Sequence, residues 1–296
     1  MSAQISLEEL NAAAPEQFVA ALGAIYEHSP WVAETVADKR PFATLAALHE
    51  AMGGTVRAAD DARKRALLNA HPDLAGKAAR AGSLTADSKA EQAGAGLDRL
   101  SEDEFKNFHR LNESYRKRFG FPFIICVGRH GKDSVFQQFE TRLKNDAAAE
   151  RETALQEVVR IAALRLDRHV RAPDKLKVNG RLSTHVLDAY HGRPAQNVAV
   201  ELHELSKTGG SRTIFAGETN VDGRADRAPI GDRPLPIGTY ELRFAVGDYF
   251  ARAGLQLPDP PFLDIVPVRF SIAEPEGHYH VPLLMTPWSY STYRGS

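Results

Sequence analysis

The hydrophobic pattern of this chain changes period once, and that change decides how the chain can fold. Up to Leu166 the apolar residues recur every three to four positions, as on one face of a helix. From Leu182 onward they alternate or cluster in short runs between glycine, proline and asparagine, which is typical of strands. We therefore expect a multidomain protein with an all-α N-terminal domain at 1–168, a polar linker at 169–180 and an all-β sandwich domain at 181–296.

The first half is expected to form a series of helices. A capping box begins at Ser6, and Phe18, Leu22 and Ile25 then share one helical face. Further helical patterns cover 41–53, 60–70, 86–99, 102–118, 133–144 and 148–168. Residues 119–128 interrupt them, because a proline and flanking glycines disfavour a helix. We expect this segment to be extended, with backbone groups that can face a ligand.

The second half is expected to form several short strands. The strand patterns cover 181–190, 197–206, 212–220, 238–246 and 264–273, each bounded by turn residues. This spacing predicts a sandwich of two sheets. One short helix is expected at 247–253, where Asp248 is placed to cap it.

The composition excludes several classes of protein. A formal net charge of −1 gives no overall field that would attract nucleic acid or an anionic membrane. The single cysteine, Cys126, lies in an apolar run, so an inert buried thiol is expected and an intrachain disulfide is impossible. The N-terminus lacks the layout of a signal peptide, and no apolar run reaches about 18 residues. We expect a cytoplasmic protein whose partners are small molecules.

The stretch around His71 carries the first candidate site. A His-Pro pair, His71 and Pro72, ends an apolar helical run, so the imidazole is expected at a helix end, where it stays usable. Downstream, Ser88, Glu91 and Gln92 stand at i, i+3 and i+4, which places them on one helical face. They can surround one small polar molecule. Equally, His71 can cap a helix while the other three form a solvated face.

These residues resemble the 2-oxo-4-hydroxy-4-carboxy-5-ureidoimidazoline (OHCU) decarboxylase family. The likeness also includes YEHSPWVAE from Tyr26, LNESYRKRFGFPFIICVGRHGKD from Leu111 and RLKND from Arg142. It covers roughly residues 5–168. The tripeptide HPD by itself also occurs in J-domain cochaperones, but no other feature of a J-domain is present.

The resemblance implies roles for individual residues. His71 would be the acid/base group, Glu91 would hold it or bind the ureido group, and Arg165 would bind the substrate anion or enolate oxygen. Without the resemblance, Arg165 would be read as an exposed helix cation. The remaining substrate-binding residues would be Pro72, Ser88, Gln92, Ile124 and Cys126, the last two through their backbone. The substrate can accept the electrons of the broken bond, so no cofactor is expected.

The second half carries another set of chemical groups. His185 stands in a strand pattern, Arg224 follows an Asn-Val-Asp-Gly turn, and His278 and His280 fall on one face of a strand. Taken singly, each histidine is most simply a surface group. Three histidines can also bind zinc, but a nearby arginine repels a cation and no carboxylate or thiol completes the set, so we expect no metal.

The second half resembles the 5-hydroxyisourate hydrolase family, the enzymatic relatives of transthyretin. The likeness lies in LSTHVLDAYHGRPAQNVAVEL, TNVDGR and GHYHVPLLMTPWSYSTYRGS, over roughly residues 180–296. It implies that His185, Arg224 and His280 are catalytic, with His278 outside the set. It also implies substrate binding by Tyr293, Arg294, Gly295 and Ser296. Either histidine can be the base that activates water, with Arg224 stabilising negative charge and depressing the pKa of a nearby imidazole.

Together the two resemblances imply a bifunctional enzyme of urate degradation. The β domain would hydrolyse 5-hydroxyisourate to OHCU, and the helical domain would decarboxylate OHCU to (S)-allantoin. The family keeps its hydrolase sites at subunit interfaces, which implies a homotetramer. Two alternatives stay open: one half has lost activity and serves assembly, or the chain is a transthyretin-like carrier with a helical partner domain. The terminal Tyr-Arg-Gly-Ser favours an enzyme.

Overall fold

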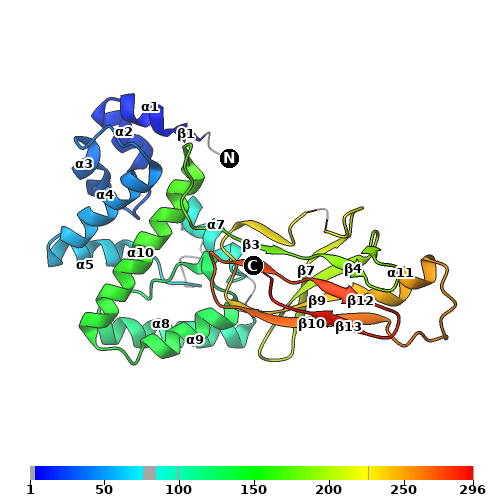
Figure 1. Cartoon of the computed structure of the whole chain (residues 1–296). Helices are drawn as coiled ribbons and strands as arrows, with labels where there is room; N and C mark the ends of the chain where they lie inside the picture. The colour runs from blue at the N-terminus through cyan, green and yellow to red at the C-terminus, as the bar shows by residue number, and fades with distance from the viewer. Residues whose placement is uncertain (1–3, 76–84, 99, 226, 296) are drawn as a thin grey trace. The chain divides into compact units, whose positions relative to one another are not determined.

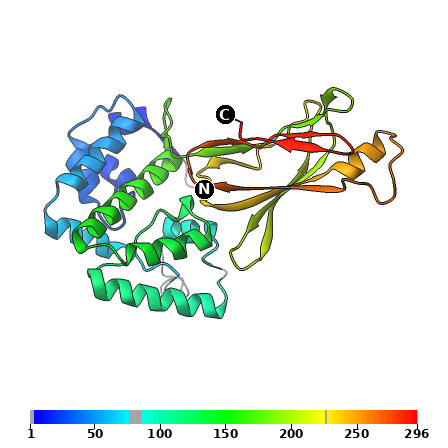
Figure 2. The same cartoon turned by 60° about the horizontal axis from the view of Figure 1, so that its bottom comes forward.

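The computed structural model describes residues 4–75, 85–98, 100–225 and 227–295 (Figures 1 and 2). The chain divides into two compact units. The first is helical and comprises the residues up to Gly128 together with Ser134–Val178. The second is built of strands and comprises Arg129–Asp133 together with the chain from Asn179. The predicted class, an all-α part followed by an all-β part, is confirmed.

The helical unit follows the predicted pattern closely. Its helices are α1 (Leu7–Ala12), α2 (Pro15–Leu22), α3 (Trp31–Ala37), α4 (Leu45–Ala58), α5 (Asp61–Ala70), α7 (Ala86–Gly94), α8 (Glu102–Phe119), α9 (Lys132–Arg142) and α10 (Ala147–His169), with a short 3-10 turn, η1, at Val127–Arg129. The capping box at Ser6 is confirmed, because its side chain accepts from the Glu9 N–H while the Glu9 carboxylate accepts from the Ser6 N–H.

Three helix predictions need correction. Helix α2 ends at Leu22, where Gly23 is the C-cap, so Ile25 lies beyond the helix. Helix α3 was not predicted, because its seven residues are too few to show a clear helical period. Helix α7 ends five residues before the predicted boundary, and Gly96 follows it with a φ of +75°, a left-handed conformation that suits glycine.

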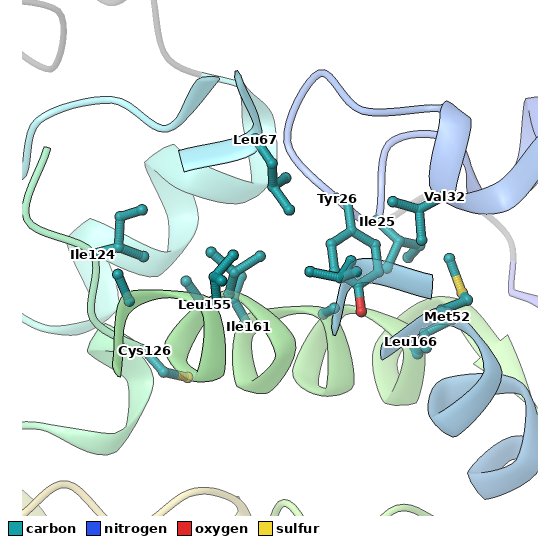
Figure 3. Packing of buried hydrophobic residues seen from close by; sticks show 14 of the residues in the cluster. Ile25, Tyr26, Val32, Met52, Leu67, Ile124, Cys126, Leu155, Ile161 and Leu166 are labelled. Carbon is teal, nitrogen blue, oxygen red and sulfur yellow. The ribbon is translucent and has the colours of Figure 1, made fainter. Parts of the chain in front are cut away.

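The long helix α10, green in Figure 1, forms the centre of the helical core. Figure 3 shows Leu155, Ile161 and Leu166 projecting from α10 among buried residues of other elements, including Tyr26 and Met52. Leu166 and Met52 are fully buried. Burying apolar side chains contributes about 1.5–3 kcal/mol for each large residue, so this face of α10 is a main source of stability.

Of the segment 119–128, predicted to be extended, residues 120–126 contain no helix or strand, whereas Phe119 is the last residue of α8 and Val127 and Gly128 lie in η1. The segment is nonetheless buried, and side chains of α10 and α9 each hold it at one point. The Cys126 N–H donates to the Glu157 carboxylate at 2.8 Å. The Ile124 carbonyl accepts from Arg142 Nη1 at 2.8 Å, and Arg142 is itself paired with the fully buried Glu150 at 2.6 Å. Polar groups of this segment are therefore satisfied inside the core.

Residues 169–178, predicted as linker, lie in the helical unit. Helix α10 continues to His169, and β2 (Val170–Arg171) pairs in parallel with β1 (Ile5–Ser6). The Asp174 carboxylate then accepts from the Leu45 and Ala46 N–H groups at 2.9 and 3.2 Å, at the N-terminus of α4. Asp174, one of the polar residues that suggested a linker, thus caps a helix.

The β unit contains four-stranded and three-stranded sheets. Its elements are β3 (Gly180–Ser183), β4 (Val186–Asp188), β5 (Arg193–Pro194), β6 (Ala199–Leu205), β7 (Ser211–Glu218), β8 (Ile230–Arg233), β9 (Gly238–Ala245), α11 (Val246–Arg252), β10 (Ile265–Ile272), β11 (His278–His280), β12 (Leu283–Met285) and β13 (Tyr290–Thr292). The sheet orders are β10-β9-β6-β7, β11-β3-β8 and β13-β12-β4-β5. Inward-facing residues of these sheets form one core.

The last two sheets are joined through shared chain segments. Strand β11 runs parallel to β3, and β12 runs parallel to β4. Between these pairs the hydrogen bonds continue, because Val281 N–H donates to the Ser183 carbonyl and Leu283 N–H donates to the His185 carbonyl. His185 therefore lies in a fixed position between β3 and β4.

The predicted short helix is present as α11, but Asp248 does not cap it. The N-cap is Ala245, which has no side-chain oxygen to accept a hydrogen bond. Asp248 lies instead in the first turn, where its charge favours the positive end of the helix. Separately, none of the helices in the described ranges is both long and apolar enough to span a membrane.

We predict that Arg142→Met destabilises the helical unit by about 3–5 kcal/mol, because it leaves the buried Glu150 carboxylate without its cation. Urea unfolding followed by circular dichroism at 222 nm measures the loss. The matched control is Arg151→Met, which breaks a surface pair with Asp61 and should change stability by less than about 1 kcal/mol. Equal effects of the two variants would contradict the assignment.

Candidate active sites

A pocket in the helical unit contains nearly all the residues predicted for the first site. Its volume is about 360 Å³, including the space open to solvent. The lining residues are His71, Pro72, Leu74, Ser88, Glu91, Gln92, Phe123, Ile124, Ile125, Val127, Ile161 and Arg165. Seven of the eight predicted residues are among them, drawn from α5, α7, α10 and the buried 120–126 segment. Residues far apart in sequence thus meet at one cavity.

His71 is the C-cap of α5, as predicted, and is only 7% exposed. Its Nδ1 lies 2.9 Å from the Leu67 carbonyl oxygen, so Nδ1 carries the proton and Nε2 is the basic nitrogen. Burial lowers the pKa of His71 to about 4; the Leu67 carbonyl and Glu27 oppose this shift, and Arg165 adds to it. The imidazole is therefore neutral at pH 7.

The predicted face of α7 is present and points into the pocket. Ser88 and Gln92 are 5% and 6% exposed, which excludes the alternative of a solvated face. Gln92 Oε1 accepts from the Ala75 N–H at 2.9 Å, and Ser88 Oγ donates to Glu27 Oε2 at 3.2 Å. Two of the three α7 groups are thus already fixed by hydrogen bonds, while Glu91 is held by arginines.

Arg165 is 2% exposed, so it is not a surface cation. Its Nε and Nη2 each lie 3.0 Å from a Glu91 oxygen, and its Nη1 lies 2.8 Å from Glu27 Oε2. Nη2 also donates to Ser88 Oγ at 3.3 Å, and Nη1 to the Ile25 carbonyl at 3.4 Å. All five N–H donors of the guanidinium therefore have acceptors.

Glu27 is a central member of this site that the sequence did not predict. It is 2% exposed and accepts from Arg165, Ser88 and Thr85, the last at 2.9 Å. Burial acts to raise the pKa of Glu27, but Arg165 and Thr85 outweigh it and hold this pKa below its ordinary value. The signal was the YEHSPWVAE run, in which a carboxylate directly follows the buried Tyr26.

The charges of the pocket are balanced by its own residues. Glu91 Oε1 also lies 3.0 Å from Nη2 of Arg168, which is 48% exposed. Two carboxylates, Glu27 and Glu91, thus face two guanidinium groups. An anionic ligand can contact Arg165 only by displacing one of these partners, because no donor of Arg165 is free.

Cys126 is the predicted pocket residue that does not line the cavity. Its N–H, expected to face a ligand, donates to Glu157 instead. The Ile124 carbonyl is likewise bound to Arg142, although the Ile124 residue lines the pocket. The backbone of this segment is thus bound to the protein itself, and its neighbours Phe123, Ile125 and Val127 provide apolar wall.

The predicted catalytic residues of the β unit also lie near one another. His185 and Arg224 form an antiparallel bridge, and His280 forms another with Gly295. Gly223, with φ +72°, makes the turn before Arg224; a Cβ there would lie 2.3 Å from the Val186 carbonyl. Only glycine allows this close approach, which sets Arg224 opposite His185.

Both histidines of this site are held neutral. Burial lowers the pKa of His185, and Arg224 lowers it further. Burial is also the main cause that lowers the pKa of His280, followed by Arg224, His185 and His278. Nε2 of His185 is buried and has no hydrogen-bond partner within the described parts of the chain. It is therefore an unsatisfied polar atom, the kind that a ligand can satisfy.

The four tail residues differ in how they meet the site. Gly295 N–H donates to the His280 carbonyl at 2.8 Å, and a Cβ at Gly295 would lie 2.7 Å from Cδ2 of that imidazole. Arg294 lies over the Tyr279 ring at 4.6 Å, and Tyr293 is 58% exposed. Ser296 lies outside the described residues. Within the described chain, then, Gly295 is the tail residue that contacts a predicted catalytic group.

The zinc alternative finds no support in the geometry. Within the described ranges, no three or more His, Cys, Asp or Glu side chains are grouped so that they could hold a metal ion. The rings of His278 and His280 are 6.4 Å apart between centroids, and the Ser183 hydroxyl lies between them.

Comparison with known proteins agrees with this division of the chain. The OHCU decarboxylase family model matches residues 11–167, more than half of the chain, and the HIUase/Transthyretin family model matches residues 182–295. The chain belongs to both families. As an OHCU decarboxylase family member, it is 42% identical over 164 residues to the 2-oxo-4-hydroxy-4-carboxy-5-ureidoimidazoline decarboxylase of Halalkalicoccus jeotgali, covering 55% of this chain and 91% of that protein.

The HIUase/Transthyretin portion has equally clear relatives. It is 51% identical over 119 residues to 5-hydroxyisourate hydrolase 2 of Rhizobium meliloti, covering 40% of this chain and 98% of that protein. The whole chain is similar to a crystal structure of (S)-allantoin synthase, with 34% identity and a TM-score of 0.53 over 99% of this chain and 100% of that one. This similarity therefore extends across both family regions of the present chain.

For the OHCU decarboxylase family portion, we predict that His71 stays neutral from pH 8 down to about 5, because its folded pKa of about 4 lies below the ordinary value. The unfolded chain then binds the extra proton, so stability falls as the pH is lowered from about 6.5 towards 4. Unfolding free energies measured across this range should show a shallower slope in His71→Gln. The control, Asn107→Gln on α8, changes a residue that does not titrate and should keep the wild-type slope. An unchanged slope in His71→Gln would contradict the prediction.

Proposed function

We infer that this chain catalyses two consecutive steps of urate degradation. The β unit hydrolyses 5-hydroxyisourate to OHCU, and the helical unit decarboxylates OHCU to (S)-allantoin. The observation that carries this inference is that one chain holds two separate sets of neutral imidazole and guanidinium groups, His71 with Arg165 and His280 with Arg224. Each set lies within one of the two family regions.

The state of His71 suits the decarboxylation. Departure of carbon dioxide leaves an electron pair that the conjugated ring of the substrate accepts, so the protein needs to move protons and not electrons. The hydroxyl beside the departing carboxylate loses a proton, and the ring carbon that bears the ureido group gains one. The ring nitrogen that receives the electron pair takes up one further proton from solvent. Neutral His71 can take the first proton at Nε2 and return a proton to one face of the carbon. Delivery to one face sets the configuration.

The contacts of Arg165 favour a bracing role over direct binding of a substrate anion. Its five donors already hold Glu27, Glu91, Ser88 and the Ile25 carbonyl. Glu91 is 13% exposed and lines the pocket, so its oxygens can accept from the N–H groups of the substrate's ureido arm. In this assignment Arg165 fixes the carboxylates, and its charge offsets theirs while His71 changes protonation.

For the hydrolysis we assign the base to His280. Its Nδ1 lies 3.0 Å from Ser183 Oγ, which leaves Nε2 available to take a proton from the attacking water. Nε2 of His185 is buried, which suits a hydrogen bond from the substrate more than proton exchange with water. Arg224, the guanidinium that lowers the pKa of both imidazoles, stabilises the oxyanion that forms on the attacked carbonyl.

The two alternative functions fit the structure less well. A carrier needs an apolar cavity and has no use for a basic imidazole. Here His185 and His280 are kept neutral, and so able to accept a proton, beside Arg224. An inactive helical half would be free to lose its buried charges, since unneeded buried ion pairs are costly. The pocket instead retains the buried Arg165 with both of its carboxylate partners.

We predict that His71→Ala and His280→Ala separate the two reactions. With freshly generated 5-hydroxyisourate, His71→Ala should consume it at the wild-type rate and accumulate OHCU, because only the second acid/base group is gone. His280→Ala should slow consumption by about 10²–10⁴-fold and still convert supplied OHCU to (S)-allantoin. Ultraviolet absorbance and circular dichroism follow the two steps.

The control for these variants is His109→Ala, a partly exposed residue of α8. It should leave both reactions unchanged. If His71→Ala and His280→Ala both behave like this control, the assignment of these two histidines is wrong. If the wild-type chain accelerates neither reaction, the chain is a carrier and the proposed function is wrong; if it accelerates only one, the other half serves assembly.

We also propose that the chain acts as a homotetramer through its β unit. Large apolar side chains are exposed on and beside β13, among them Trp288 (53%), Tyr290 (44%) and Tyr293 (58%). Exposed aromatic residues grouped in this way suit a protein interface. The neighbouring hydrolase residues would then be completed by a second copy.

We predict that the mass of the assembly and its hydrolase activity depend on the same interface. Light scattering should give about four times the 32.5-kDa chain mass. Tyr290→Glu should lower this mass and slow hydrolysis, because it places a charge in the interface, while decarboxylation of supplied OHCU should continue. A 32.5-kDa species with full hydrolase activity would contradict the proposal.

A further inference from the structure

The Ser183 hydroxyl lies between two imidazoles of the β unit. Ser183 Oγ is 3.0 Å from Nε2 of His278 and 3.0 Å from Nδ1 of His280. This arrangement follows from strand pairing. In the parallel pair of β11 and β3, His280 is in register with Ser183, and His278 stands two residues earlier on the same face. The three side chains therefore form one continuous line of hydrogen bonds.

The hydroxyl has one proton, so it can donate to only one of the two rings. If Ser183 donated to His280, Nδ1 would be the bare nitrogen and Nε2 of that ring would carry the proton. If Ser183 donates to His278, it accepts from Nδ1–H of His280, and Nε2 of His280 is basic. Which nitrogen is protonated is set by the hydrogen bond that the other nitrogen makes.

The proposed role of His280 as the base favours the second arrangement. A base needs a lone pair on Nε2, and a neutral imidazole with a bare Nε2 carries its proton at Nδ1. This Nδ1–H then donates to the Ser183 hydroxyl oxygen across the 3.0 Å contact. His278, at the other end, then offers its Nε2 lone pair to the hydroxyl proton.

We propose that Ser183 and His278 are positioning residues of the hydrolase: the Ser183 hydroxyl, donating to His278, accepts from Nδ1–H of His280 and so fixes the tautomer in which Nε2 of His280 is the basic nitrogen. This inference rests on the proposed hydrolase function and on the assignment of His280 as its base. It gives a role to His278, which the sequence comparison placed outside the catalytic set, and to Ser183, which the sequence did not single out.

Other groups around His280 do not fix its tautomer. Arg224 and the His185 ring face it from the neighbouring segment, and they act on its charge. Gly295 donates its N–H to the His280 carbonyl, and its lack of a Cβ leaves room for the ring. Of these neighbours, the Ser183 side chain is the one bonded to a ring nitrogen. Removal of its hydroxyl should therefore change the tautomer without changing the strand pairing.

The test compares Ser183→Ala, Ser183→Thr and His278→Phe in the full-length protein. Steady-state hydrolysis of 5-hydroxyisourate should show kcat about tenfold lower in Ser183→Ala, with KM within about twofold, because one hydrogen bond to the base is lost. Ser183→Thr keeps the hydroxyl and should restore kcat. His278→Phe removes the acceptor and should lower kcat in the same direction.

A spectroscopic measurement tests the tautomer independently of activity. Solid-state NMR of protein labelled with ¹⁵N-histidine distinguishes protonated from bare ring nitrogens, and the His280 signals are assigned by their loss in His280→Gln. Wild type and Ser183→Thr should show His280 protonated at Nδ1, and Ser183→Ala should show a mixture. The matched control is Ser211→Ala, since Ser211 Oγ lies 3.2 Å from Nδ1 of His203, away from the site. It should change neither kcat nor the His280 signals.

The two readouts separate the possible failures. Protonation of His280 at Nε2 in the wild type, or an unchanged tautomer in Ser183→Ala, would overturn the proposal whatever the activity. A wild-type chain that does not hydrolyse 5-hydroxyisourate would instead refute the proposed function, while the NMR result still decides the role of the hydroxyl. Wild-type kcat in Ser183→Ala would show that the hydroxyl has no part in catalysis.

Discussion

The buried guanidinium of Arg165 is the interaction on which the helical site depends. It joins three parts of the unit, because it extends from α10 to Glu91 on α7 and to Glu27 in the loop after α2. Removing Arg165 would leave the buried Glu27 carboxylate without its cation, which costs several kcal/mol. The same pairing explains why His71 is neutral. Both carboxylates are paired with arginines, so they do not stabilise a protonated imidazole enough to offset the cost of burying its charge.

Other charged side chains of helix α10 also bind distant parts of the helical unit. Glu157 and Arg165 follow Glu150 by seven and fifteen residues, which is about two and about four helical turns. The three side chains therefore lie near one face of α10. Glu150 holds Arg142 and through it the Ile124 carbonyl, and Glu157 holds the Cys126 N–H. One helix thus places both the charged centre of the pocket and its apolar wall. Errors in the wall segment would be transmitted directly to the site, because both are tied to the same rigid element.

The sequence predicted those parts that depend on neighbours in the chain. The capping box at Ser6, the α7 face of Ser88, Glu91 and Gln92, and the helix-end position of His71 are all local patterns. It did not predict Glu27 or the capping of α4 by Asp174, since each acts on a partner more than 100 residues away. It failed at Cys126 because nothing in an apolar run shows which backbone groups a distant carboxylate will bind. The roles of the site residues remain predictions.

The two sites keep an imidazole neutral by different means, and this difference bears on how each depends on its surroundings. His71 is enclosed within one unit, and burial sets its pKa while the Leu67 carbonyl sets its tautomer. His280 lies on a sheet face near the chain end, where Arg224 adds to a weaker burial and a side-chain hydroxyl contacts its Nδ1. A main-chain carbonyl in a helix is fixed by the fold itself, whereas a serine hydroxyl can rotate and needs its own partner. The open site therefore requires additional residues to achieve what the enclosed site obtains from its backbone.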